Sequence, residues 1–166
     1  MRILLASAYI RAVLVLVLVL AADQLTKHLV SRSIVPGEQV RFMPGIQLVN
    51  TRNHGVAFGL EAGSQVLVTT LVGLALLALL VYFARQHASR PLIWLPTGLL
   101  LGGALGNLLD RIRDGSVVDF VQLPLGWPPF NLADTSIVFG VLLLLFVIES
   151  PRDPPTAPHE RAHPGG

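Results

Sequence analysis

The chain has 166 residues, of which 52% are hydrophobic and only 13% are charged, and its mean hydropathy is +0.65. Because a soluble domain carries about 25% charged residues, this composition excludes an ordinary soluble domain and predicts an integral membrane protein. A net charge of +2 without clustered basic residues excludes a nucleic-acid-binding surface. The chain has no cysteine, which excludes disulfides, thiol nucleophiles and thiolate metal sites.

Four apolar stretches are close to the length of about 20 residues that crosses a bilayer. They run from Ala12 to Val30, from Val66 to Phe83, from Leu92 to Leu109 and from Leu132 to Ile148. We therefore predict a mainly α-helical membrane protein with four transmembrane helices, formed by one domain at residues 1–149. The polar, Pro-rich tail at residues 150–166 is expected to be disordered.

The first apolar stretch has a second interpretation. Arg2 and Arg11 precede the apolar run from Ala12 to Ala22, which also describes a cleavable signal peptide. We favour a membrane span, because the next apolar stretch lies far downstream and the polar run from Asp23 to Lys27 follows directly. Lysine and arginine are equally divided between the two sides of the membrane, so charge counting does not fix the orientation.

The connections between the spans differ in character. Residues from Gln39 to Leu48 contain two short β-like pieces separated by Pro44-Gly45, which predicts a small sheet on the membrane surface. Residues from Arg111 to Pro129 are expected to form a loop. Its Trp127-Pro128-Pro129 segment is typical of a turn at the membrane interface.

Polar groups gather at or beside the ends of the apolar stretches. Ionisable groups cost roughly 2.5 to 3.5 kcal/mol each at the centre of a membrane helix, so a chain that keeps them there uses them. Five stretches carry them: Asp23 to Lys27, Asn53 to Gly59, Gly102 to Arg111, Val117 to Phe120 and Phe130 to Thr135.

Helical spacing predicts which of these groups lie together. Gly98, Gly102 and Gly106 recur every four residues, so another helix is expected to approach this face closely. Polar pairs with the spacing of one helix face are Asn107 with Asp110, Asn131 with Asp134, and Asp23 with Lys27. The last pair has the spacing of an ion pair. Alternating helix directions bring all three pairs to the same membrane surface.

Each acid also has a purely structural interpretation. Asp23 can be only the ion-pair partner of Lys27, and Asp110 can belong to a salt-bridged helix end. Asp119 can be a solvent-facing loop residue, although its apolar neighbours argue against full exposure. Asp134 can be a helix N-terminal residue that the macrodipole favours, although an asparagine three residues earlier already supplies a cap.

Two other kinds of chemistry find little support. The five histidines are scattered without a metal-binding motif, so we expect no metal site and no cofactor. Lys27 and Ser31 have the spacing of a Ser/Lys nucleophile pair. However, Asp23 would keep the lysine protonated, and a protonated lysine cannot act as a base. Peptide hydrolysis would then need two carboxylates that share one proton; Asp119 and Asp134 are our candidates, although the spacing alone does not identify which acids pair.

These motifs, in this order, resemble those of bacterial lipoprotein signal peptidase, also called signal peptidase II. The resemblance covers Asp23 to Thr135, and the runs GGALGNLLDR and FNLADT are its most specific parts. Val56 stands where the family usually has alanine, and Thr135 where serine is common. Neither departure touches a proposed catalytic group.

The resemblance implies a membrane aspartic endopeptidase with both termini in the cytoplasm and a small extracytoplasmic β-sheet cradle. It implies Asp119 and Asp134 as the catalytic pair, at the outer side of the bacterial inner membrane. Residues that bind substrate or support the site are then Asp23, Lys27, Asn53, Gly55, Asn107, Asp110, Arg111 and Asn131.

The implied substrate is a prolipoprotein whose cysteine carries a diacylglyceryl group, cut just before that cysteine. The implied inhibitor is the cyclic peptide globomycin. We expect membrane lipid as a partner, no nucleic acid, and a monomer. The alternative is a small non-enzymatic membrane protein, a transporter subunit or assembly factor, that uses the acids as an ion or proton path.

Overall fold

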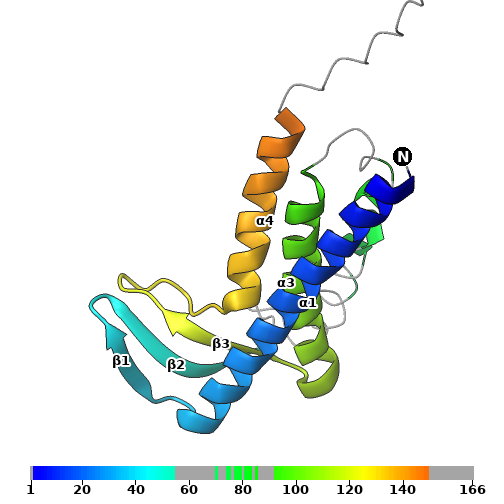
Figure 1. Ribbon diagram of the computed structural model, residues 1–166. Helices are drawn as coiled ribbons and strands as arrows, with labels where there is room; N and C mark the ends of the chain where they lie inside the picture. Colours follow the sequence, from blue (N-terminus) through cyan, green and yellow to red (C-terminus); the bar gives the residue numbers. More distant parts are fainter. Residues whose placement is uncertain are drawn as a thin grey trace, which may run out of the picture.

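The computed structural model, shown in Figure 1, describes residues 2–54, 92–149 and, between them, the helical positions 70, 74, 75, 77–79, 81–83 and 85. Its elements are α1 (Arg2–Ser33), β1 (Gln39–Met43), β2 (Ile46–Asn53), α3 (Trp94–Asp114), β3 (Val117–Gln122) and α4 (Leu132–Glu149). The predicted site residue Gly55 and the tail at residues 150–166 lie outside the described residues, as does much of the predicted span from Val66 to Phe83.

Two of the described helices are long and apolar enough to cross a membrane: α1, over Ser7–Ser33, and the whole of α4. Their outer faces are apolar as well, since Leu18 of α1 is 68% exposed and Phe146 of α4 is 67% exposed. Side chains of this size are expected to face lipid rather than water. The third predicted stretch overlaps α3, which begins two residues later and continues for five residues beyond Leu109 to Asp114.

The small sheet has the strand order β1-β2-β3, and both strand pairs are antiparallel. The predicted pair of strands around Pro44-Gly45 is confirmed as β1 and β2. The prediction of a loop from Arg111 to Pro129 is wrong in part, because Val117–Gln122 forms β3. Its β-branched and aromatic residues favour a strand that is covered on both sides, where no polar alternation marks it.

Glycines let α3 pack closely against α1 and α4. A Cβ atom on Gly98 would lie 2.7 Å from the backbone oxygen of Ala12 in α1, and one on Gly102 would lie 2.9 Å from that of Leu16. On the other side, a Cβ atom on Gly103 would lie 2.5 Å from the backbone oxygen of Ala133 in α4. The predicted close approach of a helix to this glycine face is confirmed, and α1 is that helix.

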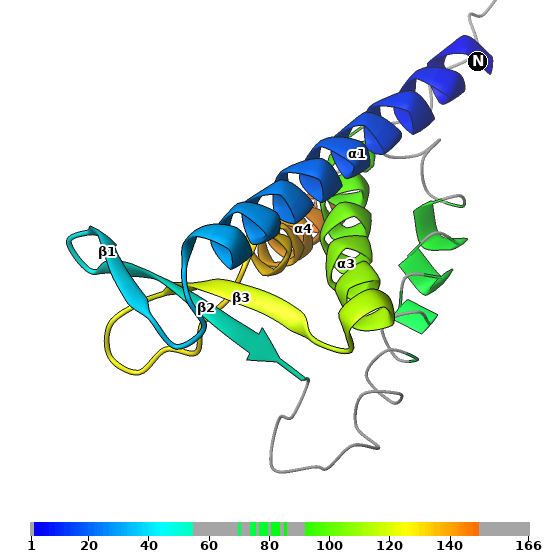
Figure 2. The ribbon, with the colours of Figure 1, turned by 90° about the horizontal axis from the view of Figure 1, so that it is seen from below.

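The sheet lies at one end of the helices, and the N-terminus and the end of α4 lie at the other (Figure 1). Seen from below, α1 and α3 lie side by side with β3 beneath them (Figure 2). Val30 and Ile34 at the end of α1 pack with Phe120 of β3 in a buried apolar cluster. This cluster ties the sheet to the helices and holds β3 over the ends of α3 and α4.

Candidate active site

Asp119 lies in the middle of β3 and is only 3% exposed. One of its carboxylate oxygens, Oδ1, accepts a 2.7 Å hydrogen bond from Nδ2 of Asn131, which is fully buried. The other, Oδ2, accepts a 3.0 Å hydrogen bond from Nδ2 of Asn53 in β2. The interpretation of Asp119 as a solvent-facing loop residue is therefore wrong, because β2 and Asn131 enclose its side chain.

Asp134 lies in the first turn of α4, beside the same asparagine. Its Oδ1 accepts a 2.7 Å hydrogen bond from Nδ2 of Asn107 in α3, and its Oδ2 accepts one of 3.2 Å from the backbone N–H of Asn131. In return, the backbone N–H of Asp134 donates to Oδ1 of Asn131 at 2.9 Å. Asn131 thus caps α4, as its sequence position predicts, and Asp134 is the reciprocal partner in that cap.

The two carboxylates interact, since Asn131 contacts both and the charge of Asp134 acts on Asp119. Burial of its side chain, opposed by the hydrogen bond from Asn53 and reinforced by the charge of Asp134, raises the pKa of Asp119 from 3.8 to about 6. Asp119 is therefore suited to hold a proton near neutral pH, as one member of an acid–base pair must.

Behind this pair, Lys27 of α1 is buried between two other carboxylates. Its Nζ lies 2.8 Å from Oδ2 of Asp23 and 2.7 Å from Oδ2 of Asp110 in α3. The predicted ion pair of Asp23 with Lys27 is confirmed, and Asp110 joins it. Asp110 also belongs to the predicted salt-bridged helix end, since Nη2 of Arg113 lies 3.9 Å from its Oδ1, but Lys27 is the nearer and more buried partner.

Asn107 connects the lysine cluster to the aspartate pair. Nζ of Lys27 donates to Oδ1 of Asn107 at 2.8 Å, and Nδ2 of Asn107 donates to Asp134. Asn131 also donates to Oδ1 of Asn107, at 3.1 Å. The lysine therefore lies one side chain away from Asp134, and its three protons face three oxygens. Engaged in this way, Lys27 does not activate Ser31, which removes the alternative of a Ser/Lys nucleophile.

Asp23 reaches a third element besides α1 and α3. Its Oδ1 accepts a 2.9 Å hydrogen bond from the backbone N–H of Ala133, in the first turn of α4. This bond fixes the start of α4, and hence Asp134, relative to α1. The interpretation of Asp23 as an ion-pair partner is confirmed, and its contact with α4 is compatible with a role in positioning Asp134.

A cavity of about 460 Å³ opens beside Asp134. Asn107, Arg111 and Asp134 line its polar end, while the rest of its described wall is apolar. Those apolar residues are Ala75, Leu79, Leu100, Ala104 and Ile137. Arg111 donates to the backbone oxygen of Asn107 at 3.3 Å. The cavity is thus suited to an apolar helical segment whose end meets the carboxylates.

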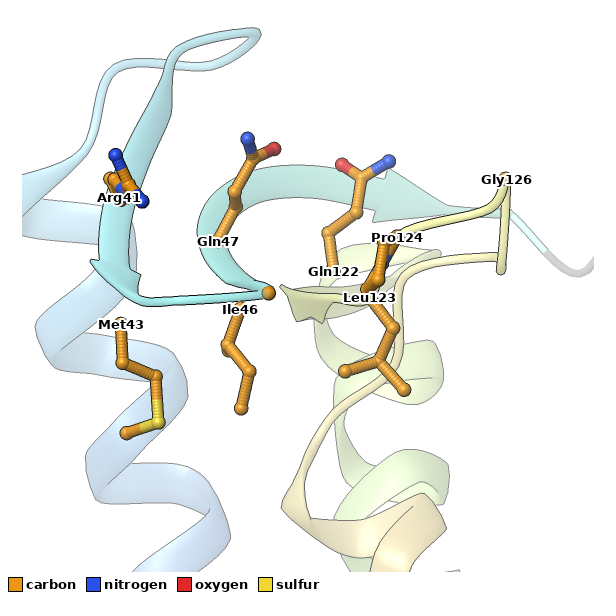
Figure 3. Close-up of a pocket in the computed structure, with 9 residues that line it drawn as sticks. Arg41, Met43, Ile46, Gln47, Gln122, Leu123, Pro124 and Gly126 are labelled. Atoms are coloured by element: carbon orange, nitrogen blue, oxygen red, sulfur yellow. The ribbon is translucent and has the colours of Figure 1, made fainter.

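A second hollow lies at the outer end of the sheet, with a volume of about 420 Å³ (Figure 3). Met43, Ile46 and Leu123 point toward the side on which the helices lie, whereas Gln47 and Gln122 point away from it. This end of the sheet is therefore amphipathic, and its apolar face is the one on the same side as the helices.

Sequence reasoning missed two contributors to the site. Nε2 of Gln24 donates to Oδ1 of Asp110 at 2.9 Å, and Oγ1 of Thr51 donates to the backbone oxygen of Asp119 at 2.9 Å. Gln24 stands inside a polar stretch that the sequence marks, so its position was the available signal. Thr51 has no such signal, because the pairing of β2 with β3 places it. In the described ranges, no three His, Cys, Asp or Glu side chains form a group that could hold a metal ion.

Comparison with known proteins agrees with this architecture. A family model described as signal peptidase (SPase) II matches residues 15–149. The lipoprotein signal peptidase of Moorella thermoacetica is 45% identical over 142 residues, which cover 83% of this chain and 92% of the relative. The lipoprotein signal peptidase of Syntrophomonas wolfei subsp. wolfei is 44% identical over 132 residues, which cover 79% of this chain and 87% of that protein.

Solved structures agree as well. One described as a bacterial membrane enzyme, determined by the in meso method at 1.9 Å resolution, has a TM-score of 0.76 at 31% identity and covers 84% of this chain and 92% of its own. Another, at 2.3 Å resolution, has a TM-score of 0.73 at 32% identity, over 82% of this chain and 86% of its own. Fold and site thus define a small, mostly helical membrane enzyme with a three-stranded antiparallel sheet. The chain belongs to the signal peptidase II family.

Proposed function

We propose that this chain is an aspartic endopeptidase of the membrane that uses Asp119 and Asp134 to cleave prolipoproteins. Cleavage falls just before a cysteine that carries a diacylglyceryl group, and it releases the signal peptide. The observation that carries the proposal is the pair of carboxylates joined through Asn131, with one of them lining an apolar cavity. The family to which the chain belongs supports the choice of substrate.

The pair supplies general acid–base catalysis without a metal or a covalent intermediate. The ionised carboxylate takes a proton from water, and the hydroxide attacks the scissile carbonyl carbon. The protonated carboxylate gives its proton to the carbonyl oxygen, which yields a neutral tetrahedral diol. The diol then returns a proton to one carboxylate while the other protonates the leaving nitrogen, and the C–N bond breaks. Both carboxylates end in their starting states.

The remaining site residues have supporting roles. Asn53, Asn107 and Asn131 donate hydrogen bonds to the pair, and the cluster of Asp23, Lys27 and Asp110 holds α1, α3 and α4 in register. Arg111 lies at the polar end of the cavity, where its charge can meet an ester or carbonyl oxygen of the lipid-modified cysteine. Gly55 is proposed as a site residue on the sequence motif alone.

Four membrane crossings account for the path of the chain. β2 ends at the sheet end of the molecule, and α3 begins at the opposite end (Figure 1). The described positions between 70 and 85 are helical, which supports one further crossing between β2 and α3. We place the termini in the cytoplasm and the active site on the outer side of the bacterial inner membrane. One chain carries both aspartates, so a monomer suffices.

The sheet is proposed to rest on the outer surface of the membrane. Its apolar side chains Met43, Ile46 and Leu123 point toward the side of the helices, and Trp127 is 61% exposed in the turn beyond β3. Aromatic and aliphatic groups in such positions are stable at the level of the lipid headgroups. A signal peptide would then reach the carboxylates from the bilayer through the apolar cavity. Residues 1–149 make up this peptidase domain.

The direct test is cleavage of a diacylglyceryl-modified prolipoprotein by purified protein in detergent, in the presence of a chelator. Asp119→Asn and Asp134→Asn would run beside the wild type, and globomycin would serve as the inhibition control. Cleavage by the folded wild type alone is the expected result. Cleavage by either variant would show that the substituted aspartate is not a member of the catalytic pair. Inhibition of wild-type cleavage by the chelator would indicate a metal-dependent mechanism instead of an aspartic one.

The geometry of the site does not support the alternative function, an ion or proton path across the membrane. The most buried acids of the described chain, Asp23, Asp110 and Asp119, gather near the sheet end rather than along the helices. A path across the bilayer would need polar groups near its midplane. The named relatives are peptidases, and no observation favours transport.

A further inference from the structure

A hollow that is separate from the active-site cavity lies where the ends of α1 and α3 meet β2, and its volume is about 460 Å³. Lys27 forms part of its inner wall, but neither Asp119 nor Asp134 lines it. Peptide hydrolysis by the aspartate pair therefore gives this hollow no task.

Two arginines from different elements give the hollow a positive charge. Nη1 of Arg52 in β2 lies 3.7 Å from Oδ2 of Asp114, and Nη2 of Arg113 in α3 lies 2.9 Å from the same oxygen. Asp114 is the one acid in the described lining, so one negative charge faces two positive charges. The side chains of Arg52 and Arg113 are 44% and 66% exposed, so a ligand can reach both guanidinium groups.

The charges of the buried lysine cluster face one another rather than the hollow. Nζ of Lys27 lies between Oδ2 of Asp23 and Oδ2 of Asp110, and neither acid lines the hollow. Arg113 reaches Asp110 only at 3.9 Å, a longer separation than its 2.9 Å contact with Asp114. The two arginines are thus the charged groups that a ligand in the hollow would meet.

The helix α1 adds two further donors on the face that lines the hollow. His28 and Ser31 lie three residues apart, which places them on one helix face, and both border the hollow. An imidazole N–H and a hydroxyl can each donate a hydrogen bond, and the planar guanidinium group of an arginine can donate two to one oxyanion. Hydrogen bonds from charged donors to phosphate oxygens are among the strong ones. The donors of α1, β2 and α3 therefore suit a phosphate group.

The hollow also borders the lipid-facing surface of the helices. Leu25, which lines it, and Leu29, one turn further along α1, are both exposed. On α3, Ile112 is exposed next to Arg113 in the sequence. Large apolar side chains on the outside of membrane helices face acyl chains, whereas arginines lie at the level of the headgroups. A ligand in this hollow therefore meets headgroup-level donors and an acyl-chain surface together.

We propose that this hollow is a binding site for the headgroup phosphate of an anionic phospholipid, held by Arg52 and Arg113, with its acyl chains against the exposed leucines of α1. A choline or ethanolamine headgroup would add a cation, and the single acid of the described lining already has two arginine partners. A bound phosphate would connect α1, β2 and α3 next to Lys27 and so stabilise the frame of the active site. The proposal goes beyond peptide cleavage and shares with it only the position of the sheet end at the membrane surface.

The test follows thermal unfolding of the purified full chain in phosphatidylcholine nanodiscs to which phosphatidylglycerol is added in increasing proportion. A ligand that binds only the folded protein raises its melting temperature. We expect a rise on the order of 5 °C for the wild type at saturation. The double variant Arg52→Gln, Arg113→Gln should lose most of this rise, because glutamine keeps a hydrogen-bonding amide but removes the charge.

A second double variant with the same loss of charge is the matched control. Arg32→Gln with Arg41→Gln removes two exposed arginines that do not line this hollow, and this variant should keep the full rise. An equal loss in both double variants would show that the lipid acts on the overall charge of the protein, and it would overturn the proposed site. A wild type whose melting temperature does not respond to phosphatidylglycerol would also overturn it.

Ser31→Glu keeps the proposal testable if the variant without the two arginines does not fold. It leaves the pairs of Arg52 and Arg113 with Asp114 intact and places a carboxylate among the donors, so it should abolish the rise. A full rise in Ser31→Glu would contradict the proposal.

Inorganic phosphate added to phosphatidylcholine nanodiscs separates a lipid headgroup from a free anion. It should leave the melting temperature unchanged, because it has no acyl chains to place against α1. A rise equal to that with phosphatidylglycerol would show that the hollow binds a free anion and no lipid. None of these measurements uses a prolipoprotein, so their failure is distinct from a failure to cleave prolipoprotein, which would reject the proposed function itself.

Discussion

Two pairs of carboxylates lie on either side of Asn107, and the groups between their members differ. Asp23 and Asp110 share the ammonium group of Lys27, at 2.8 and 2.7 Å. Asp119 and Asp134 instead share the neutral Asn131. A cation between two acids contacts both carboxylates and offsets one of their two negative charges, which makes them part of the scaffold. A neutral amide adds no positive charge between the members of the second pair, and burial together with the charge of Asp134 favours retention of a proton by Asp119, which hydrolysis requires.

The largest expected effect tests the catalytic side of this comparison. Asp119→Asn and Asp134→Asn should each lower kcat by roughly 10²- to 10⁴-fold, because each removes one partner of general acid–base catalysis. Single-turnover cleavage of prolipoprotein in detergent measures the loss, with circular dichroism to confirm the helical fold. Retention of the wild-type kcat in either variant would show that the substituted aspartate has a structural role and no catalytic one.

The scaffold side is tested by Lys27→Met, which leaves two buried carboxylates without their cation. Loss of one partner from a buried ion pair typically costs about 3 to 5 kcal/mol of folding free energy. Thermal unfolding should show a large decrease in stability. Arg113→Met is the matched control, because its side chain is 66% exposed and its ion pair with Asp114 should contribute less than about 1 kcal/mol. Similar losses of folding free energy in both variants would show that the buried Lys27 cluster stabilises the protein no more than an exposed ion pair does.

The pH dependence of stability sharpens the comparison further. The pKa of Asp119 is raised from 3.8 to about 6 in the folded protein, so the folded state binds its proton more tightly than the unfolded state. The wild type should therefore lose stability relative to Asp119→Asn as the pH rises from about 4 to about 6, by about 3 kcal/mol at most, and no further above that range. Unfolding curves that stay parallel from pH 4 to pH 7 would show that Asp119 titrates normally.

The smallest expected effect concerns the link between helix packing and the lysine cluster. In Gly106→Ala the new Cβ atom would lie 2.5 Å from Oδ2 of Asp23, whereas in Gly102→Ala its nearest neighbours would be Val19 and the backbone of Leu16. Both changes should cost about 1 to 3 kcal/mol through overpacking. Only Gly106→Ala should also lower activity at a temperature where both variants are folded, because it displaces Asp23 from Lys27 and Ala133. Equal activity in the two variants would show that helix packing at Gly106 does not affect the active site.

Much of the fold was predictable from local patterns. Apolar length predicted α1, α3 and α4, Pro44-Gly45 predicted the β1–β2 hairpin, and the glycine spacing predicted a close helix neighbour. β3 was missed because Val117 and Val118 are both buried, so the strand shows no alternation of apolar and polar residues. A strand covered on both sides resembles a short apolar loop in the sequence.

The sequence by itself determined that this chain is a membrane protein and that its polar residues gather near the ends of its helices. Those features follow from composition and from helical spacing, which are local. Only the tertiary structure decided which acids act together. Lys27 forms an ion pair with Asp110, which is far away in the chain. Asn131 forms hydrogen bonds with Asp119 of β3 and Asp134 of α4, so these two acids form a pair with no cation between them. Ion pairs and hydrogen bonds depend on distance in space, and the packing of α1, α3, α4 and the sheet sets those distances.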